Sequence, residues 1–359
     1  MVIHVLDRAF NLIDVVDDYI SVIWRPAYYG VGDFEIYMDA SAKAVQLLQK
    51  NRYLVRDTDI EVDESGNITY TKVMVIKNIN LTTDAENGDH ISFTGRELKY
   101  LLHQRIVWKQ TRMNSKVEYG IRRLVTENAI SPTDPNRVIP NLVLGAEAGL
   151  SERMDKQVTG KYLDESITEI CATYGYGWEV FVYNSTMVFI VYQGLDRSYN
   201  QSERPYVVFS DEFDNILNSD YQMQSEAYAN TTLIGGEGEG TERIYTTVGN
   251  SNSGLERYET FTDGSGISQN KGSEDEIPLE EYLVLLQEAG KETLAGLGIT
   301  EGFNGEVISD GAFKYGRDFY IGDTVTVINH YGIKKDVLVL SAIEVQDETG
   351  TKLVPQFNI

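Results

Sequence analysis

Histidine and cysteine are the first candidates for nucleophilic or metal chemistry, and this chain has few of them. No two of its four histidines have the short spacing that zinc ligands need. The histidines are His4, His90, His103 and His330. The single cysteine, Cys171, lies on the apolar face of an expected helix, where a buried thiol is the usual arrangement. These residues predict neither a nucleophile nor a metal centre.

A glycine-rich run at residues 235–240 has the composition of a phosphate-binding loop. Such loops lead into the amino terminus of a helix and often contain a lysine. Here Glu237 and Glu239 lie inside the run, and a strand is expected to follow it. Because two carboxylates repel a phosphate, we interpret the run as a flexible turn.

Carboxylates are abundant, with 55 Asp and Glu residues in the chain. Pairs suited to glycoside hydrolysis therefore arise by chance, and no pair stands out. Residues 263–266 resemble the start of a calcium loop, but Glu274 fits the twelfth position only by count. We favour an ordinary polar loop over a calcium site here.

Aromatic side chains are the last candidates, because exposed rings can form a platform for sugars. Tyrosine also suits subunit interfaces, where one end of the side chain is dry and the other is wet. We favour the structural role and keep the carbohydrate platform as the alternative. The residues considered are Tyr28, Tyr29, Tyr174, Tyr176 and Trp178.

The composition of the chain excludes some classes of protein. The 359 residues carry 31 Lys and Arg against 55 Asp and Glu, so the net charge is 31 − 55 = −24. That charge argues against a nucleic-acid binder that neutralises phosphates. A hydrophobic content of 42% is enough for a core, and the length suggests two or three domains. No signal peptide, apolar span or membrane anchor is expected.

Short strands are expected to dominate residues 1–97, because apolar and polar residues alternate there. The clearest strands are 20–24, 34–38 and 73–76, with a hairpin at 59–71. Ser41 is expected to cap a short helix that reaches residue 50. Its inward side chains would be Ala44, Val45, Leu47 and Leu48. So many short strands indicate a small β-barrel or sandwich.

Helices are expected to mix with strands in residues 98–205. Ser115 and Glu118 have the form of a capping box at the start of one helix. A second helix is expected over residues 164–174, with Gly175 as its stop. A hairpin is expected from strands 178–183 and 187–192. This section therefore reads as an α+β insert.

Strands return in residues 206–359, around one long helix near residues 278–296 that Pro278 opens. The clearest strands are 231–234, 242–248, 324–329 and 336–346. The expected fold class is thus mainly β with an α+β insert. Two small β-barrel domains, residues 1–97 and residues 206–359, would flank the helix-containing insert, residues 98–205.

Several segments occur in a fixed order along nearly the whole chain. They are residues 21–37, 94–107, 137–142, 209–216 and 315–327. In this order they resemble the hub family of bacteriophage or prophage tail baseplates, the short Tal-like tail-associated proteins. The structural positions of that resemblance are Trp24, Phe34, Gly95, Arg105, Phe209, Asn215, Asp318, Gly322 and Asp323.

The resemblance implies a structural virion protein at the tail tip. In that family, three chains form a ring of six β-barrels that links the sixfold tail tube or distal tail ring to the threefold tip. The implied partners are two further copies, the distal tail protein or tail tube ring, the tape measure protein and tail fibre or tip proteins. DNA would pass through the channel without specific binding. Assembly would take place in the cytoplasm of the host bacterium.

The resemblance implies no catalytic residue, cofactor or metal. Many relatives continue into a fibre or a peptidoglycan-cleaving domain, whereas this chain stops after its presumed last strand, so we expect no enzyme. The alternatives are a tail-tip cell-wall hydrolase and a carbohydrate-binding module. A trimer would carry 3 × −24 = −72 charges. Part of this excess would line an acidic channel, or else it serves solubility on a solvated outer face.

Overall fold

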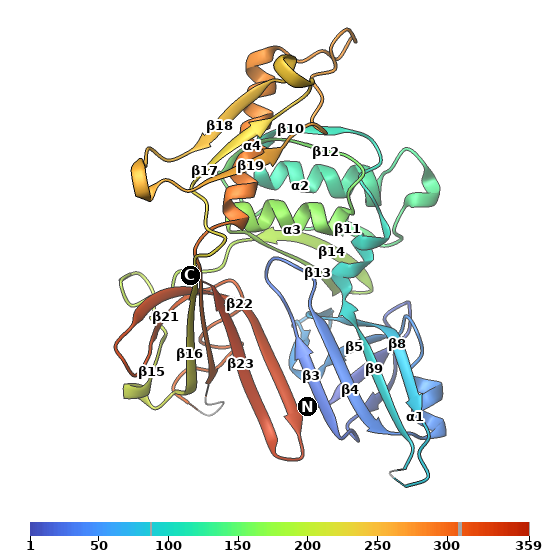
Figure 1. Cartoon of the computed structure of the whole chain (residues 1–359). Helices are drawn as coiled ribbons and strands as arrows, with labels where there is room; N and C mark the ends of the chain where they lie inside the picture. The colour runs from blue at the N-terminus through green and yellow to red at the C-terminus, as the bar shows by residue number, and fades with distance from the viewer. Residues whose placement is uncertain (87, 308–310, 359) are drawn as a thin grey trace.

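The computed structural model describes residues 1–86, 88–307 and 311–358. Two β modules lie side by side, and helices with smaller sheets lie together against one end of the pair (Figure 1). The described residues of both modules share one 13-stranded sheet, whose main path is β16-β20-β23-β22-β3-β4-β9-β8-β5-β1-β2. The expected class, mainly β with an α+β insert, is confirmed.

The first β module is antiparallel. It consists of β1 (Ile3–Leu6), β2 (Leu12–Val16), β3 (Ser21–Arg25), β4 (Asp33–Asp39), α1 (Ala42–Leu47), β5 (Tyr53–Arg56), β8 (Met74–Thr82) and β9 (His90–Glu97). Alternate residues of β3 and β4 are buried, as a half-covered sheet requires. Trp24, Phe34 and Phe93 fill the core between them.

The short helix α1 begins as expected but ends early. The Ser41 hydroxyl accepts a hydrogen bond from the Ala44 amide at 3.0 Å, which confirms the cap. The helix stops at Leu47, before residue 50, and Val45 is exposed rather than inward. One and a half turns are too short to bury a second apolar column.

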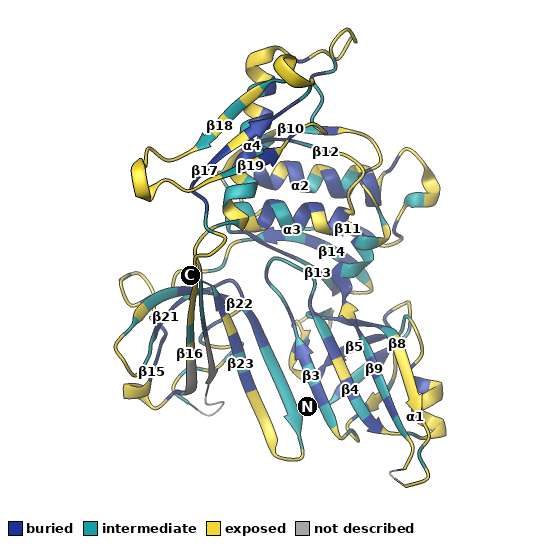
Figure 2. Ribbon diagram, in the orientation of Figure 1, coloured by how far each residue is buried: buried dark blue, intermediate teal, exposed yellow. Residues whose placement is uncertain are grey.

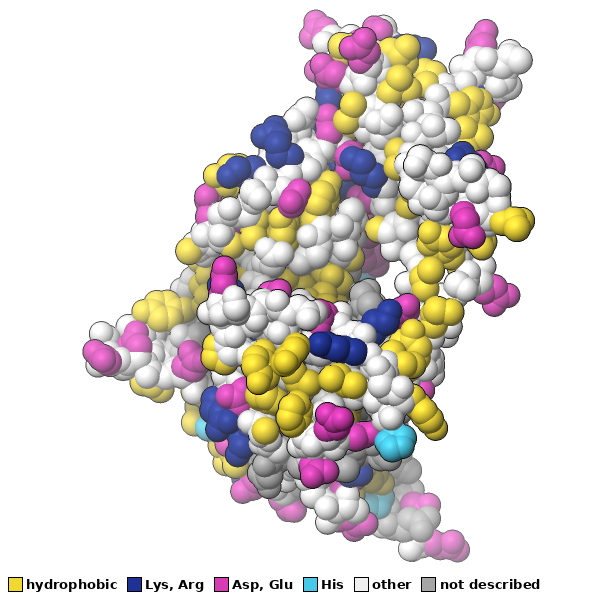
Figure 3. Space-filling view, turned by 90° about the vertical axis from the view of Figure 1, so that its left-hand side faces the viewer, with side chains coloured by type: hydrophobic (Ala, Val, Ile, Leu, Met, Phe, Trp, Pro, Cys, Tyr) yellow, Lys and Arg dark blue, Asp and Glu magenta, His cyan; other side chains and the backbone are white. Residues whose placement is uncertain are grey.

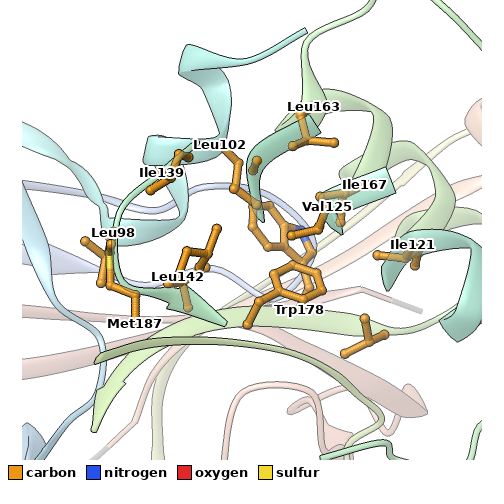
Figure 4. Packing of buried hydrophobic residues seen from close by; sticks show 14 of the residues in the cluster. Leu98, Leu102, Ile121, Val125, Ile139, Leu142, Leu163, Ile167, Trp178 and Met187 are labelled. Carbon is orange, nitrogen blue, oxygen red and sulfur yellow. The ribbon is translucent and has the colours of Figure 1, made fainter. Parts of the chain in front are cut away.

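The insert packs two helices on a small sheet. Its elements are β10 (Thr111–Lys116), α2 (Val117–Val125), β11 (Leu142–Leu144), β12 (Arg153–Val158), α3 (Leu163–Tyr174), β13 (Gly177–Tyr183) and β14 (Thr186–Tyr192). The expected hairpin is confirmed as β13 and β14. The helical stop at Gly175 is also confirmed, because its φ of 72° is left-handed. Trp178 lies in the core that both helices cover (Figure 4).

The expected capping box is wrong. Ser115 lies in β10, and its hydroxyl donates to the Lys116 carbonyl instead of accepting from the helix. The Glu118 carboxylate accepts three backbone amides of residues 148–150, at 2.7–3.1 Å. Strand pairing of β10 with β12 fixes Ser115 before the helix begins, so tertiary pairing overrides the local cap signal.

The predicted hairpin at residues 59–71 leaves the first module. Its strands, β6 (Ile60–Val62) and β7 (Ile68–Tyr70), join the sheet of the insert in the order β11-β14-β13-β7-β6. Val182 and Tyr183 of β13 pair with Tyr70 and Thr69. A hairpin that lies more than a hundred residues before β13 in the sequence thus completes the sheet of the insert.

The long helix α4 (Leu279–Gly296) follows Pro278 as expected. It covers the small sheet of β17 (Thr231–Gly235), β18 (Tyr245–Gly249) and β19 (Glu259–Asp263), and it also contacts β12 and α3 of the insert. We call this sheet and helix the α4 unit. Ile234, Tyr282 and Leu286 form its core.

The second β module consists of β15 (Val208–Ser210), β16 (Ile216–Gln224), β20 (Thr300–Val307), β21 (Thr324–Ile328), β22 (Lys334–Asp347) and β23 (Gly350–Asn358). Phenylalanine rings fill its core, and Figure 2 shows buried segments along the strands of both modules. The far end of β22 pairs with β3, with Glu344 opposite Trp24. This pairing joins the two modules; the division of the chain at residues 97 and 205 stays a prediction.

Short 3₁₀ and π helices connect these elements. The 3₁₀ helices are η1 (Asp57–Asp59), η2 (Leu98–Gln104), η4 (Pro135–Arg137), η5 (Asp211–Phe213), η6 (Gly240–Glu242) and η7 (Gly254–Glu256), and η3 (Thr126–Ile130) is a π-helical turn after α2. The glycine-rich run leads from β17 into η6 and β18, so its interpretation as a turn between strands is confirmed.

Candidate functional site

Buried and half-buried charges lie where the two β modules and the insert meet. We call this set the charged junction. Its members are Arg56, Asp59, Lys72 and Glu97 of the first module and its hairpin, Lys99 and Glu179 of the insert, and Glu344 of the second module. Charged side chains are rarely buried unless they are paired, so their pairing explains how this interior is stable.

Arg56 ties the first module to the second. Its side chain is only 2% exposed, and it binds both carboxylate oxygens of Asp59 at 2.5 and 2.9 Å. A third guanidinium nitrogen donates to Glu344 Oε2 of β22 at 2.7 Å. The guanidinium also lies 5.5 Å from the centre of the Trp24 ring. Such a two-pronged contact fixes orientation as well as charge, which a lysine would not do.

Lys72 ties the hairpin of the first module to the insert. Its ammonium lies 2.8 Å from Glu179 Oε2 on β13. Burial by itself lowers the pKa of Lys72, but Glu179, together with smaller contributions from Tyr192, Tyr315 and Glu97, outweighs burial and holds this pKa well above its usual value. Burial raises the pKa of Glu179, and Lys72 reverses that shift, so the net pKa is lowered. Both groups are therefore charged at neutral pH.

Glu97 and Lys99 hold the loop between β3 and β4 against the insert. Lys99 Nζ lies 3.2 Å from Glu97 Oε2 and donates to the Ala27 carbonyl at 2.6 Å. Glu97 Oε2 accepts the Gly32 amide at 2.7 Å. The Lys99 ammonium also lies 5.1 Å from the Trp178 ring centre. Burial lowers the pKa of Lys99, and Glu97 offsets part of this shift.

The charged junction was not found from the sequence. Arg56 and Glu344 are 288 positions apart, and Lys72 and Glu179 are 107 apart. No short motif links such partners. The available signal was the run Glu97-Leu98-Lys99, which falls inside a segment that carries the family resemblance.

Three of the predicted structural positions meet in the first core. The rings of Trp24 and Phe34 lie 5.7 Å apart. A Cβ on Gly95 would lie 1.9 Å from the Val75 carbonyl oxygen and 2.6 Å from the Phe34 ring. Glycine at this position therefore allows β9 to lie close to β8 and to the aromatic pair.

Four further positions lie in the second module. Phe209 packs 5.2 Å from the Phe319 ring. Asn215 closes a buried turn: its side chain accepts the Ser210 amide and donates to the Val208 carbonyl, both at 2.8 Å. Asp323 accepts the Leu195 amide and pairs with Arg197, both in the segment that leaves the insert. Gly322 precedes it with a left-handed φ of 95°.

The remaining two positions, Arg105 and Asp318, lie near the surface. Arg105 Nε donates to the Arg137 carbonyl at 2.6 Å. Asp318 pairs with its neighbour Arg317 at 2.6 Å and accepts the Lys314 amide. All nine positions thus stabilise local structure, and the structure distributes them over both modules and the insert rather than bringing them together. A part for them in assembly stays a prediction.

The other chemical candidates are occupied by structural contacts. Cys171 is fully buried, and burial raises the pKa of its thiol, so it is a poor nucleophile. Asp263 of the calcium-like loop pairs with Arg243 at 2.6 Å. Across the described ranges, no three His, Cys, Asp or Glu residues form a group that could hold a metal ion. Within those ranges, no helix is long and apolar enough to span a membrane.

Many apolar side chains are exposed on the surface, and two groups of them concern the ends of the large sheet. On β2, which ends the sheet, Leu12, Ile13 and Val15 face outward, and we call them the β2 edge. Beside β21, the exposed rings of Tyr199 and Tyr206 lie 5.3 Å apart, with the Lys334 ammonium 4.3 Å from the centre of the Tyr199 ring. We call this second group the outer aromatic patch. Figure 3, viewed from the side of β15 and β21, shows hydrophobic side chains gathered on that face.

This architecture is that of phage and prophage tail proteins. A tail protein from Neisseria meningitidis MC58 superposes with a TM-score of 0.60 at 15% identity, covering 99% of this chain and 96% of the other. The 43 kDa tail protein of prophage MuSo2 from Shewanella oneidensis gives 0.60 at 11% identity, covering 99% and 98%. The prophage tail protein gp18 from Listeria monocytogenes EGD-e gives 0.53 at 14% identity, covering 99% and 94%.

The sequence agrees with the fold. The chain belongs to the family of the siphovirus ReqiPepy6 Gp37-like protein, whose sequence model matches residues 2–357. The resemblance to bacteriophage tail baseplate proteins is therefore confirmed. No curated protein matches the chain.

Proposed function

We propose that this chain is a structural hub of the phage tail tip, in which three copies form a ring. The observation that carries the proposal is the pairing of β22 with β3, which sets two β modules side by side in each chain. Three copies would then supply six modules in a circle. Such a ring can face a sixfold tail tube or distal tail ring on one side and a threefold tip on the other.

The β2 edge and the outer aromatic patch are our candidates for the contact that closes the ring. An edge strand with exposed apolar side chains invites pairing unless a partner covers it. Asp17 and Asp18 follow β2 and are exposed, whereas Lys334 lies beside the outer aromatic patch. Opposite charges and apolar surfaces thus favour contact of one patch with the other in a neighbouring copy.

In this proposal the ring lies in the virion tail and is assembled in the cytoplasm of the host bacterium. Its neighbours are the distal tail protein or tail tube ring, the tape measure protein and tail fibre or tip proteins. DNA passes through the centre, and part of the 3 × −24 = −72 charge lines this path and repels the phosphates. The proposal contains no enzymatic step, and no observation favours a cell-wall hydrolase.

Sedimentation and electron microscopy of the full chain test this proposal. The monomer has a mass of 40.5 kDa, so a trimer has 3 × 40.5 = 121.5 kDa. We expect that mass for the chain alone, or three copies of the chain in a larger complex when the distal tail protein is added. Micrographs should show threefold particles with a central hole. A monomer under both conditions contradicts the trimer. A ring with a basic lumen contradicts the acidic channel.

A further inference from the structure

Trp108 differs from the other tryptophans of the chain in being exposed. It is 63% exposed, whereas Trp24 and Trp178 are completely buried. An indole ring is the largest apolar side chain, and placing it in water is unfavourable unless it serves a contact. Trp108 lies outside both the β2 edge and the outer aromatic patch, so the proposed ring contact does not account for it.

The ring of Trp108 borders a surface pocket in the insert. The pocket has a volume of about 600 Å³, within the range of roughly 300–1,000 Å³ that small-molecule sites occupy. Its wall comes from the start of β10, the end of α2 and the loop around η4. Gln110, Ser131 and Thr133 add polar side chains to this wall.

Neighbouring residues hold Trp108 in place. Its backbone amide donates to Asn128 Oδ1 at 3.2 Å. The Arg137 guanidinium lies 4.6 Å from the centre of the indole ring and donates to the Ile106 carbonyl at 2.6 Å. This guanidinium covers part of the ring, and the exposed remainder faces solvent. These contacts restrain the residue before any ligand arrives, which lowers the entropy cost of binding.

The pocket is locally positive in an acidic protein. It contains Lys109, Arg123 and Arg137 against Glu127 and Asp134, so its net charge is 3 − 2 = +1, whereas the whole chain carries −24. Arg123 pairs with Glu127 at 2.6 Å. Lys109 forms no ion pair with any carboxylate in the described part of the chain. An anionic group of a ligand would form an ion pair with Lys109.

We infer that this pocket binds an acidic saccharide. The exposed part of the indole offers a flat apolar surface to the C–H face of a sugar ring, and the polar side chains offer partners for its hydroxyl groups. Lys109 and Arg137 supply the charge for a carboxylate or phosphate on that sugar. The aromatic residues considered from the sequence do not form such a platform, because Tyr28, Tyr176 and Trp178 are buried.

Tryptophan fluorescence of the full chain tests this inference directly. Because Trp24 and Trp178 are buried, quenching or a wavelength shift on addition of ligand reports Trp108. The probes are a uronic-acid oligosaccharide, a neutral oligosaccharide of equal length and a glutamate peptide. We expect saturable binding of the acidic sugar, weaker with added salt, and little binding of the other two.

Variants identify the residues responsible, with calorimetry as the readout because the fluorophore is lost. Trp108→Ala is expected to weaken binding about tenfold or more, and Trp108→Phe less. Lys109→Gln should weaken binding of the acidic sugar by about threefold to tenfold. Tyr331→Ala, an 89% exposed ring outside the pocket, is the matched control and should bind normally.

Each other outcome overturns the inference. The acidic saccharide is not the ligand if no binding occurs at millimolar sugar or if the neutral sugar binds equally well. It is also not the ligand if a folded Trp108→Ala variant keeps its affinity. Preferential binding of the glutamate peptide assigns the pocket to a protein partner. Loss of the oligomer in Trp108→Ala, with normal circular dichroism, makes it a subunit contact. Sedimentation of the unmodified chain tests the proposed ring separately, so the two failures are distinguishable.

Discussion

At the charged junction, single side chains determine how three parts of the chain sit against one another. Arg56 contacts Asp59 in its own module and Glu344 in the other, and Lys72 reaches Glu179 in the insert. Replacing both partners of such a pair by apolar groups can be neutral, whereas removing one partner leaves a buried charge alone. The pairs therefore specify position more than they add stability.

Arg56→Met tests this view. The change leaves the carboxylates of Asp59 and Glu344 without their cation, so we expect a loss of about 3–5 kcal/mol in the free energy of unfolding. Chemical denaturation measures it. Arg317→Met is the matched control, because Arg317 pairs with Asp318 at the surface and its loss should change stability little. Equal losses of stability in the two variants would show that the charged junction contributes no more than a surface ion pair.

The Lys72–Glu179 pair gives a prediction about pH. Because the pKa of Glu179 is lowered in the folded chain, its ionised form adds stability above the usual glutamate value of 4.5, and this stability is lost as the pH falls. Glu179→Gln should be less stable at neutral pH, and its difference from the unmodified chain should shrink in acid. Thermal unfolding over a pH series measures this difference.

A double variant is the control for that series. Lys72→Met with Glu179→Gln leaves neither charge, so it should recover part of the neutral-pH stability and keep the weaker acid dependence. If the stability difference between Glu179→Gln and the unmodified chain stays constant down to acid pH, the Lys72–Glu179 pair is not its source.

Helices and strands with strong local signals were predicted from the sequence, whereas features that depend on distant partners were not. The helix after Pro278 and the stop at Gly175 were predicted, because a periodic apolar face and a left-handed glycine are local properties. The capping box at Ser115 was wrong because β12 recruits that residue as a strand. The placement of β6 and β7 in the sheet of the insert, like the charged junction, depends on partners that no short pattern encodes.

Close packing of β9 on β8 gives the prediction at this scale. In Gly95→Ala, the new methyl group meets the Val75 carbonyl oxygen and the Phe34 ring, so β9 must shift. We expect a loss of about 1–3 kcal/mol in the free energy of unfolding. Gly302→Ala, also in a strand but with no atom within 4 Å of the added Cβ, should be close to neutral. If Gly95→Ala leaves the free energy of unfolding unchanged, β8 and β9 can move apart without loss of stability.

For the whole molecule, the proposed ring requires the β2 edge to contact a neighbouring copy. Leu12→Lys places a charge on the β2 edge, where the side chain is 56% exposed, so folding should be unaffected. We expect association to weaken about tenfold or more, as measured by sedimentation over a concentration series. Leu255→Lys makes the same change at a 93% exposed leucine away from both patches and should assemble normally. Equal assembly of the two variants removes the β2 edge from the ring contact.

The strand β22 also has a mechanical consequence. It pairs with β21 near its start, with β23 over much of its length and with β3 near its end. A force that pulls the two modules apart along this strand loads several hydrogen bonds at once in shear, rather than opening them one after another. In the proposed hub, a force on the tail tip would thus be transmitted along one continuous strand, and the two modules would move as a unit.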